Sequence, residues 1–142
     1  MYYIDAIQRY IPVNEQEKND KRAILKFIEK YQDDVLYRDN SIAHITSSGF
    51  IMNRALDKVL FIHNNIINSW ALAGGHADGD KDLLCIAMKK VKEKTGIINV
   101  KPLFEEIAAI DIIGVNPCAE QGLPAYGVCN LGHINLSRIL LS

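Results

Sequence analysis

Residues 74–97 read GGHADGDKDLLCIAMKKVKEKTGI, and this stretch decides which fold the chain is expected to adopt. It predicts a helix over residues 80–95, because apolar residues recur at helical spacing and lysines occupy the last turn. Asp78 or Asp80 is expected to cap the helix, and Gly96 stands where a left-handed residue ends many helices. A glycine pair and an acidic loop precede it, so the order is strand, loop, helix and glycine stop.

The flanking segments extend this order in both directions. A helix is expected over residues 19–36, capped by Asn19 or Asp20. The remaining segments are rich in β-branched residues and are expected to be extended, over residues 42–53, 58–63, 97–101, 103–115 and 128–141. Helices and strands do not alternate regularly. The sequence therefore predicts an α+β fold with a mixed sheet rather than a doubly wound one.

Composition limits the class of protein. The chain has 142 residues, 49% of them hydrophobic, which suits one globular domain over residues 1–142. Its formal net charge of −1 argues against non-specific nucleic-acid binding. No apolar run is long enough to cross a membrane, and the N-terminus does not resemble a secretory signal, so we expect a cytoplasmic protein without a membrane partner. Three cysteines without C-x-x-C spacing argue against a disulfide framework.

The glycine-rich loop allows three interpretations on its residues alone. A glycine pair lets a ligand approach the backbone closely, and the start of a helix behind it favours anions. Acidic loop residues could instead hold a hard cation. The third interpretation is an ordinary turn between a strand and a helix, with aspartates that cap the helix.

This stretch resembles the box of the Nudix (MutT-like) hydrolase family, G-x5-E-x7-R-E-U-x-E-E-x-G-U, where U is a bulky aliphatic residue. With Gly75 on the first glycine, Gly96 falls on the second without a gap, and Val91 and Ile97 fall on the U positions. Residues 74–80 also resemble a subgroup whose loop begins G-G-H-x-D-G. The resemblance implies a Nudix-type α/β/α sandwich with a mixed sheet.

The C-terminus departs from the family's usual plan. Nudix folds commonly place a helix after the last strands, whereas this sequence ends at Ser142, directly after the last expected strand. We therefore expect the sandwich to lack its C-terminal helix. An uncovered apolar sheet face would favour a homodimer.

The box itself is degenerate. Lys81 occupies the first glutamate position and Lys89 the arginine position. Lys90 and Lys94 replace two of the three clustered glutamates, so that only Glu93 is retained. The formal charge of residues 89–94 is +3, whereas the family motif carries about −2, and this change disfavours a cluster of several metal ions.

The family hydrolyses nucleoside diphosphates linked to another moiety, with Mg²⁺ or Mn²⁺ assisting the attack of water at phosphorus. The resemblance implies that Glu93 is a metal ligand or general base, joined at the metal by Gly74, Gly75 and Asp80. Contacts to a nucleotide-like small-molecule substrate or its phosphates would come from Gly75, His76, Asp78, Lys90 and Lys94. Carboxylates from outside the box that could assist the metal are Glu105, Glu106, Asp111 and Glu120.

Three functional hypotheses follow from the lysine substitutions. The protein is a weak hydrolase with a reduced ligand set, a non-catalytic module that binds nucleotide or phosphate through Lys90 and Lys94, or a scaffold with an inactive site. The four histidines lack the short spacing typical of a zinc site. His44 is interpreted as a structural histidine, while a position facing the pocket is considered for His133.

Overall fold

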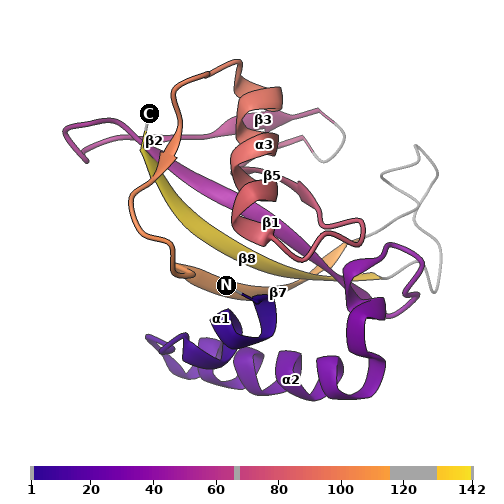
Figure 1. The fold of residues 1–142 in the computed structure, drawn as a ribbon. Helices are drawn as coiled ribbons and strands as arrows, with labels where there is room; N and C mark the ends of the chain where they lie inside the picture. Colours follow the sequence, from indigo (N-terminus) through magenta and orange to yellow (C-terminus); the bar gives the residue numbers. More distant parts are fainter. Residues whose placement is uncertain (1, 66–67, 116–130, 142) are drawn as a thin grey trace.

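The computed structural model describes residues 2–65, 68–115 and 131–141, and its centre is a mixed β-sheet (Figure 1). The two long strands β1 (Ala43–Met52) and β8 (Leu131–Leu141) run parallel through the middle of this sheet. Shorter strands pair antiparallel with them, namely β2 (Val59–Leu60) and β5 (Ala73–His76) with β1, and β6 (Lys101–Pro102) and β7 (Ala109–Val115) with β8. Strands β3 (Ile62–Asn64) and β4 (Ser69–Ala71) form a separate hairpin.

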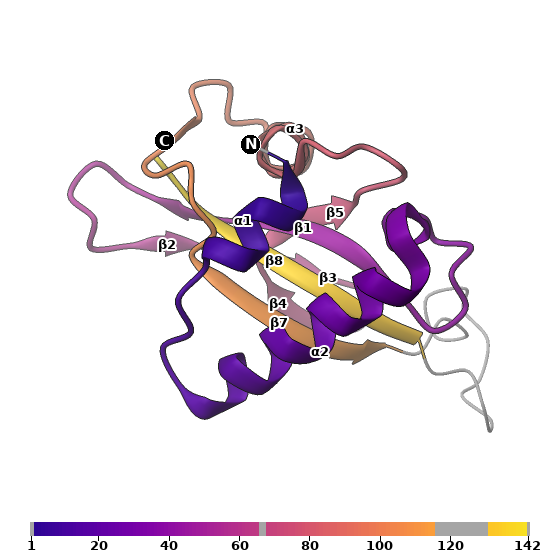
Figure 2. The ribbon, with the colours of Figure 1, turned by 60° about the horizontal axis from the view of Figure 1, so that its bottom comes forward.

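Three α-helices accompany the sheet in the described part of the chain. They are α1 (Tyr3–Arg9), α2 (Glu15–Tyr31) and α3 (Leu83–Thr95), and a short 3₁₀ helix, η1 (Gln32–Leu36), follows α2. Figure 2 shows α1 and α2 in front of β8 and β7, and α3 end-on at the top of the view. The expected α+β class with a mixed sheet is confirmed, and the arrangement is compatible with an α/β/α sandwich. Among the described residues, no helix follows β8.

One face of the sheet forms the core. In a strand, side chains alternate between the two faces, and the odd positions of β1 and the even positions of β8 carry buried apolar residues. Ile45, Ile134 and Leu136 belong to one cluster with apolar side chains of all three helices. A second cluster joins β1 and β8 to α3, and consists of Ile51, Ala73, Val91, Val100 and Leu140.

Helix α2 begins earlier than the sequence predicted. The cap is Asn14 rather than Asn19 or Asp20: its side chain accepts a hydrogen bond from Glu17 N at 2.8 Å. The helix ends at Tyr31 because Gln32 has a positive φ of 54°, and the chain continues as the 3₁₀ helix η1. Helix α1 was not predicted.

Helix α3 confirms the helix predicted over residues 80–95, although it begins at Leu83. Its cap is Asp82, which accepts from Cys85 N at 3.1 Å, and not Asp78 or Asp80. Gly96 ends the helix as expected, in the left-handed conformation with φ 73°.

The glycine pair lies in strand β5 rather than in the loop that follows. A Cβ on Gly74 would lie 2.6 Å from the Cβ of Ser48 in β1, so only glycine allows this close strand pairing. The expected strand over residues 58–63 is likewise divided, because Phe61 separates β2 from β3. Both differences depend on which strands pair with each other, and the local sequence pattern does not specify this pairing.

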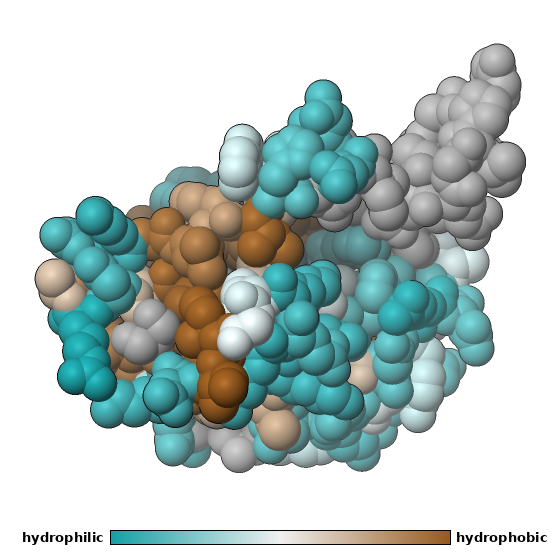
Figure 3. All heavy atoms as spheres, turned by 90° about the horizontal axis from the view of Figure 1, so that it is seen from above, coloured by the Kyte–Doolittle hydropathy of each residue, from teal (hydrophilic) through white to brown (hydrophobic). Residues whose placement is uncertain are grey.

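The surface seen from above Figure 1 carries a patch of apolar side chains bordered by hydrophilic ones (Figure 3). Several apolar residues remain only partly buried against the second core cluster, namely Ile62, Leu84, Met88 and Ile97. Within the described residues, no helix combines the length and the apolar character that crossing a membrane requires.

Candidate functional site

The packing of α3 against β5 brings together most of the residues expected from the box. Lys90, Glu93 and Lys94 stand at i, i+3 and i+4, which places them on one side of the helix. The ammonium group of Lys94 donates a hydrogen bond to the carbonyl oxygen of Gly74. The aliphatic part of Lys90 covers Gly75, where a Cβ would lie 2.8 Å from Lys90 Cδ. The glycine pair and the charged side of the helix therefore meet at one place.

The charge at this place is net positive. Lys90 Nζ lies 3.4 Å from Glu93 Oε2, so the single carboxylate is already shared with an ammonium group. Desolvation by burial lowers the pKa of Lys94, and the nearby charge of Lys90 adds to this effect, while Glu93 opposes it. Two ammonium groups beside one carboxylate attract an anion such as phosphate.

This arrangement does not fit Mg²⁺ or Mn²⁺. Both ions prefer several oxygen ligands, but the Gly74 carbonyl accepts from Lys94 and the Glu93 carboxylate faces Lys90. Asp80 lies at the opposite end of the helix, where its carboxylate accepts from Asp82 N at 2.9 Å. At a rise of about 1.5 Å per residue, the cap residue Asp82 and Glu93 are roughly 16 Å apart along the helix axis. Asp80 and Glu93 therefore do not converge on one ion.

The acidic loop is held by contacts of its own. Asp78 accepts two hydrogen bonds from Arg38, at 2.8 and 2.9 Å, and this guanidinium lowers the pKa of the Asp78 carboxyl. Gly79 N donates to the carbonyl of Leu36 at 3.0 Å. Gly79 has φ 89°, and a Cβ there would meet the ring of Tyr37 at 2.7 Å. In this structure Asp78 orders the loop through Arg38.

The carboxylates from outside the box lie elsewhere. Glu105 lines a pocket of about 230 Å³ that also contains Arg138 and the cap residue Asp82, at the start of α3. Glu106 acts electrostatically on the same buried Arg138, whose pKa falls to about 10 because of burial. The pKa of Asp111 is raised by burial and by the charge of Glu17 on α2. Glu120 lies outside the described residues.

A second group of chemically active side chains lies on the polar face of the sheet. His44 in β1 and His133 in β8 are direct register partners, and His76 extends from β5 on the other side of β1. The ring centroids are 4.7 Å apart for His44 and His133, 4.9 Å for His44 and His76, and 5.3 Å for His76 and His133. One ring nitrogen of each histidine lies within 4.8 Å of the other two. The three imidazoles therefore form one compact cluster.

The protein environment keeps two of these imidazoles neutral. Desolvation by burial lowers the pKa of both His44 and His76 to about 4. The second cause of the lowered pKa is the charge of His133 in the case of His44, and the charge of Arg38 in the case of His76. At neutral pH each of these two rings therefore keeps one nitrogen lone pair.

Polar side chains continue the same face along β1 and β8. Asn135 Oδ1 accepts from Thr46 Oγ1 at 3.2 Å and from Ser48 Oγ at 3.1 Å. Ser48 and Ser137 hydroxyls lie 3.1 Å apart, and Asn135 Nδ2 donates to Ser137 Oγ at 3.1 Å. Thr46, Ser48 and Ser137 are buried, so this face is polar although it is shielded from water.

The interpretation of His44 as a structural histidine did not anticipate this cluster. Sequence spacing did not reveal the cluster because the three histidines come from three strands, and His44 and His133 meet through the parallel pairing of β1 with β8. A signal was present in the alternation of the two strands. His-x-Thr-x-Ser at residues 44–48 and His-x-Asn-x-Ser at residues 133–137 both place polar residues on every second position. Two such strands indicate that one face of the sheet is polar.

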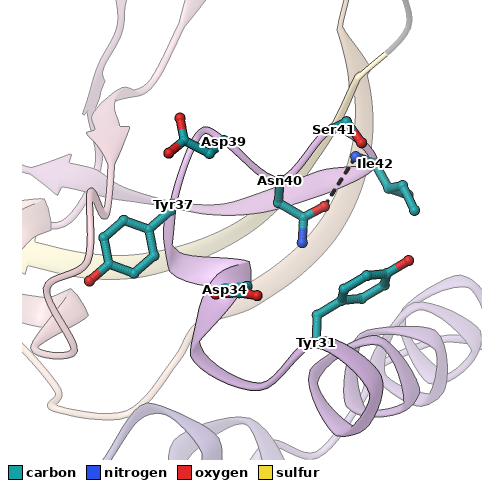
Figure 4. Close-up of a pocket in the computed structure, with 7 residues that line it drawn as sticks. All are labelled: Tyr31, Asp34, Tyr37, Asp39, Asn40, Ser41 and Ile42. Atoms are coloured by element: carbon teal, nitrogen blue, oxygen red, sulfur yellow. Dashed lines mark hydrogen bonds between the residues drawn. The ribbon is translucent and has the colours of Figure 1, made fainter.

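A separate pocket of about 450 Å³ lies beside η1, between α2 and the start of β1. Figure 4 shows Tyr31 and Tyr37 on different sides of it, with Asn40 between them. The Asn40 side chain accepts a hydrogen bond from Ile42 N at 3.1 Å. None of the residues expected from the box lines this pocket, so its position does not support the expected site.

Comparison with known proteins leaves the family unassigned. No protein-family model matches the chain, and no curated protein matches it significantly.

Proposed function

We propose that the chain is a Nudix-type hydrolase that cleaves a nucleoside diphosphate linked to another moiety, at the surface between α3 and β5. The observation that supports this proposal is the meeting of Gly74 and Gly75 with the charged side of α3. The resemblance of residues 74–97 to the Nudix box implies the same placement.

The described side chains offer two of the functions that such a reaction requires. Glu93 is the carboxylate that can accept a proton from an attacking water molecule. Lys90 and Lys94 supply positive charge beside the glycine pair, where phosphoryl oxygens would lie, and this charge stabilises the negative charge that develops in the transition state. No step in this proposal depends on a metal ion at α3.

The test is hydrolysis of a panel of nucleoside diphosphate derivatives with Mg²⁺, with Mn²⁺ and with chelator. The Glu93→Gln variant is compared with Glu29→Gln, an exposed glutamate on α2. We expect turnover to fall at least about 100-fold in Glu93→Gln and to stay unchanged in Glu29→Gln. Turnover in chelator would mean that the lysines replace an ion. Turnover only with Mg²⁺ or Mn²⁺ would mean that an ion displaces Lys94 from Gly74.

A second candidate function is non-catalytic binding of a nucleotide or of phosphate. It is favoured by the contacts of Lys94 with Gly74 and of Lys90 with Glu93, which occupy the oxygens that a metal would need. Binding without hydrolysis, lost in Lys90→Gln and Lys94→Gln and weakened by salt, would replace the hydrolase proposal with this one. Absence of both binding and turnover in folded protein would contradict both.

A further inference from the structure

We infer that His44, His76 and His133 form a binding site for Zn²⁺ or a similar divalent transition metal on the polar face of the sheet. This inference is independent of the proposed function, because the three histidines lie on β1, β5 and β8, whereas Lys90, Glu93 and Lys94 lie on α3. Of the three histidines, only His76 belongs to the stretch that resembles the Nudix box, and the resemblance implies contact with the substrate there rather than with a metal ion.

The geometry of the three imidazoles is close to that of a metal-bound set. Zinc binds histidine nitrogen at about 2.0–2.1 Å, so two nitrogens of a tetrahedral site lie roughly 3.3 Å apart. Nε2 of His44 and Nδ1 of His76 lie 2.9 Å apart in a hydrogen bond, so a bound ion would take the place of the proton between them, and one ring nitrogen of each of the three histidines lies within 4.8 Å of the other two. Metal binding would require the third nitrogen to move closer, and the terminal torsion of histidine is broad, which favours such an adjustment of the ring.

The backbone holds these rings in place. His44 and His133 are paired residues of two long parallel strands, and His76 is paired with Thr46, two positions from His44. Three ligands carried on adjacent hydrogen-bonded strands lose little conformational freedom when they bind an ion.

The chemistry of the donors selects the kind of ion. An all-imidazole set suits Zn²⁺, Cu²⁺, Ni²⁺ or Fe²⁺, whereas Mg²⁺ requires oxygen ligands. Arg38 lowers the pKa of both His44 and His76, and Asp78, which forms an ion pair with Arg38, offsets part of this effect. The Asp78 carboxylate therefore reduces the repulsion between Arg38 and a cation bound by the imidazoles.

The described residues supply three protein ligands to this cluster. A tetrahedral ion held by three histidines keeps a fourth position for water or for a ligand oxygen, which is the arrangement of catalytic rather than structural zinc sites. In such a site the ion lowers the pKa of its bound water to about 7. The site would therefore accept a small oxygen donor such as hydroxide or carboxylate.

The test uses the full chain, stripped with chelator and titrated with Zn²⁺ in competition with a chromogenic chelator. His76→Gln and His133→Gln are compared with His63→Gln, because His63 lies in β3, bonded to Asn65 and outside the cluster. His44 is left intact because it is almost fully buried and its replacement endangers folding. Far-UV circular dichroism and urea unfolding in chelator check that each variant is folded.

We expect one Zn²⁺ per chain in the unchanged protein and in His63→Gln. Loss of a supporting group typically weakens metal binding 10–100-fold, so loss of a ligand in His76→Gln or His133→Gln should weaken it by about 100-fold or more. Equal affinity in all variants, or the absence of stoichiometric binding by folded protein, would overturn the inference.

Cobalt provides a second readout that separates histidine from cysteine ligation. Co²⁺ in the proposed site should give visible bands typical of a tetrahedral nitrogen and oxygen environment, and these bands should be lost in His76→Gln. Near-ultraviolet charge-transfer bands typical of thiolate ligands would place the ion on cysteine instead and would contradict the proposed site.

Discussion

Replacing Glu17 by Gln tests how α2 is attached to the sheet. Glu17 is buried, and its carboxylate accepts hydrogen bonds from Tyr10 Oη at 2.7 and 2.8 Å, from Val13 N at 2.9 Å and from Ile110 N at 3.3 Å. These contacts join α1, the start of α2 and the edge strand β7. Burial tends to raise the pKa of Glu17, but the three donors together lower it below its ordinary value.

The expected cost follows from these donors. A hydrogen bond to a charged group contributes about 1.5–3 kcal/mol, and a buried donor without a partner costs about 1–3 kcal/mol. An amide retains one accepting oxygen, and Tyr10 can redirect its hydroxyl to the Ala108 carbonyl, which lies 3.3 Å away. We therefore expect Glu17→Gln to lower the free energy of unfolding by about 2–3 kcal/mol, close to the cost of one charged hydrogen bond.

Urea unfolding followed by circular dichroism measures this change. With a slope of about 2 kcal/mol/M, the unfolding midpoint should fall by roughly 1–1.5 M. Glu15→Gln is the matched control, because Glu15 is exposed in the same first turn, and it should cost less than about 1 kcal/mol. A midpoint for Glu17→Gln equal to that of the control would refute the reasoning.

The pH dependence gives an independent check. The pKa of Glu17 is lower in the folded chain than the ordinary value of 4.5, so its stabilising contribution is complete above pH 4.5. This contribution is lost as the pH falls through the lowered folded-state pKa. The difference in unfolding free energy between the unchanged protein and Glu17→Gln should therefore shrink as the pH falls below 4.5, and a constant difference would contradict the assignment.

Further changes test the helix cap and the core. Asp82→Ala removes the side chain that accepts from Cys85 N, and should lower the unfolding free energy by about 1 kcal/mol in urea titrations; no change would mean that the cap is dispensable. Gly49→Ala would place a Cβ 2.6 Å from Leu140 Cδ1, so we expect a loss of about 1–3 kcal/mol by the same assay. Gly114→Ala is its control, since a Cβ there meets nothing within 4 Å, and should be neutral or stabilising by up to about 1 kcal/mol.

Local patterns in the sequence predicted several elements correctly. Strand β1 was expected over residues 42–53 and lies at Ala43–Met52. Helix α3 and its end at Gly96 were also expected, because apolar spacing and a left-handed glycine are local signals. The predicted start of α2 was wrong. Asn14, Asn19 and Asp20 are all residue types that cap helices, and the contacts of Glu17 with Tyr10 and Ile110 favour the start at Asn14.

The two candidate sites differ in how far the sequence specified them. Residues 74–97 determined by themselves that a glycine pair precedes a lysine-rich helix, because strand, loop and helix are consecutive in the chain. Tertiary structure decided that Lys94 contacts the Gly74 carbonyl and that Asp80 lies far from Glu93. The alternation of residues 44–48 and 133–137 indicated a polar face, but only tertiary structure brought the three histidines together. His76 and His133 follow His44 by 32 and 89 residues in the sequence, and the parallel pairing of β1 with β8 is a long-range contact that neither segment specifies by itself.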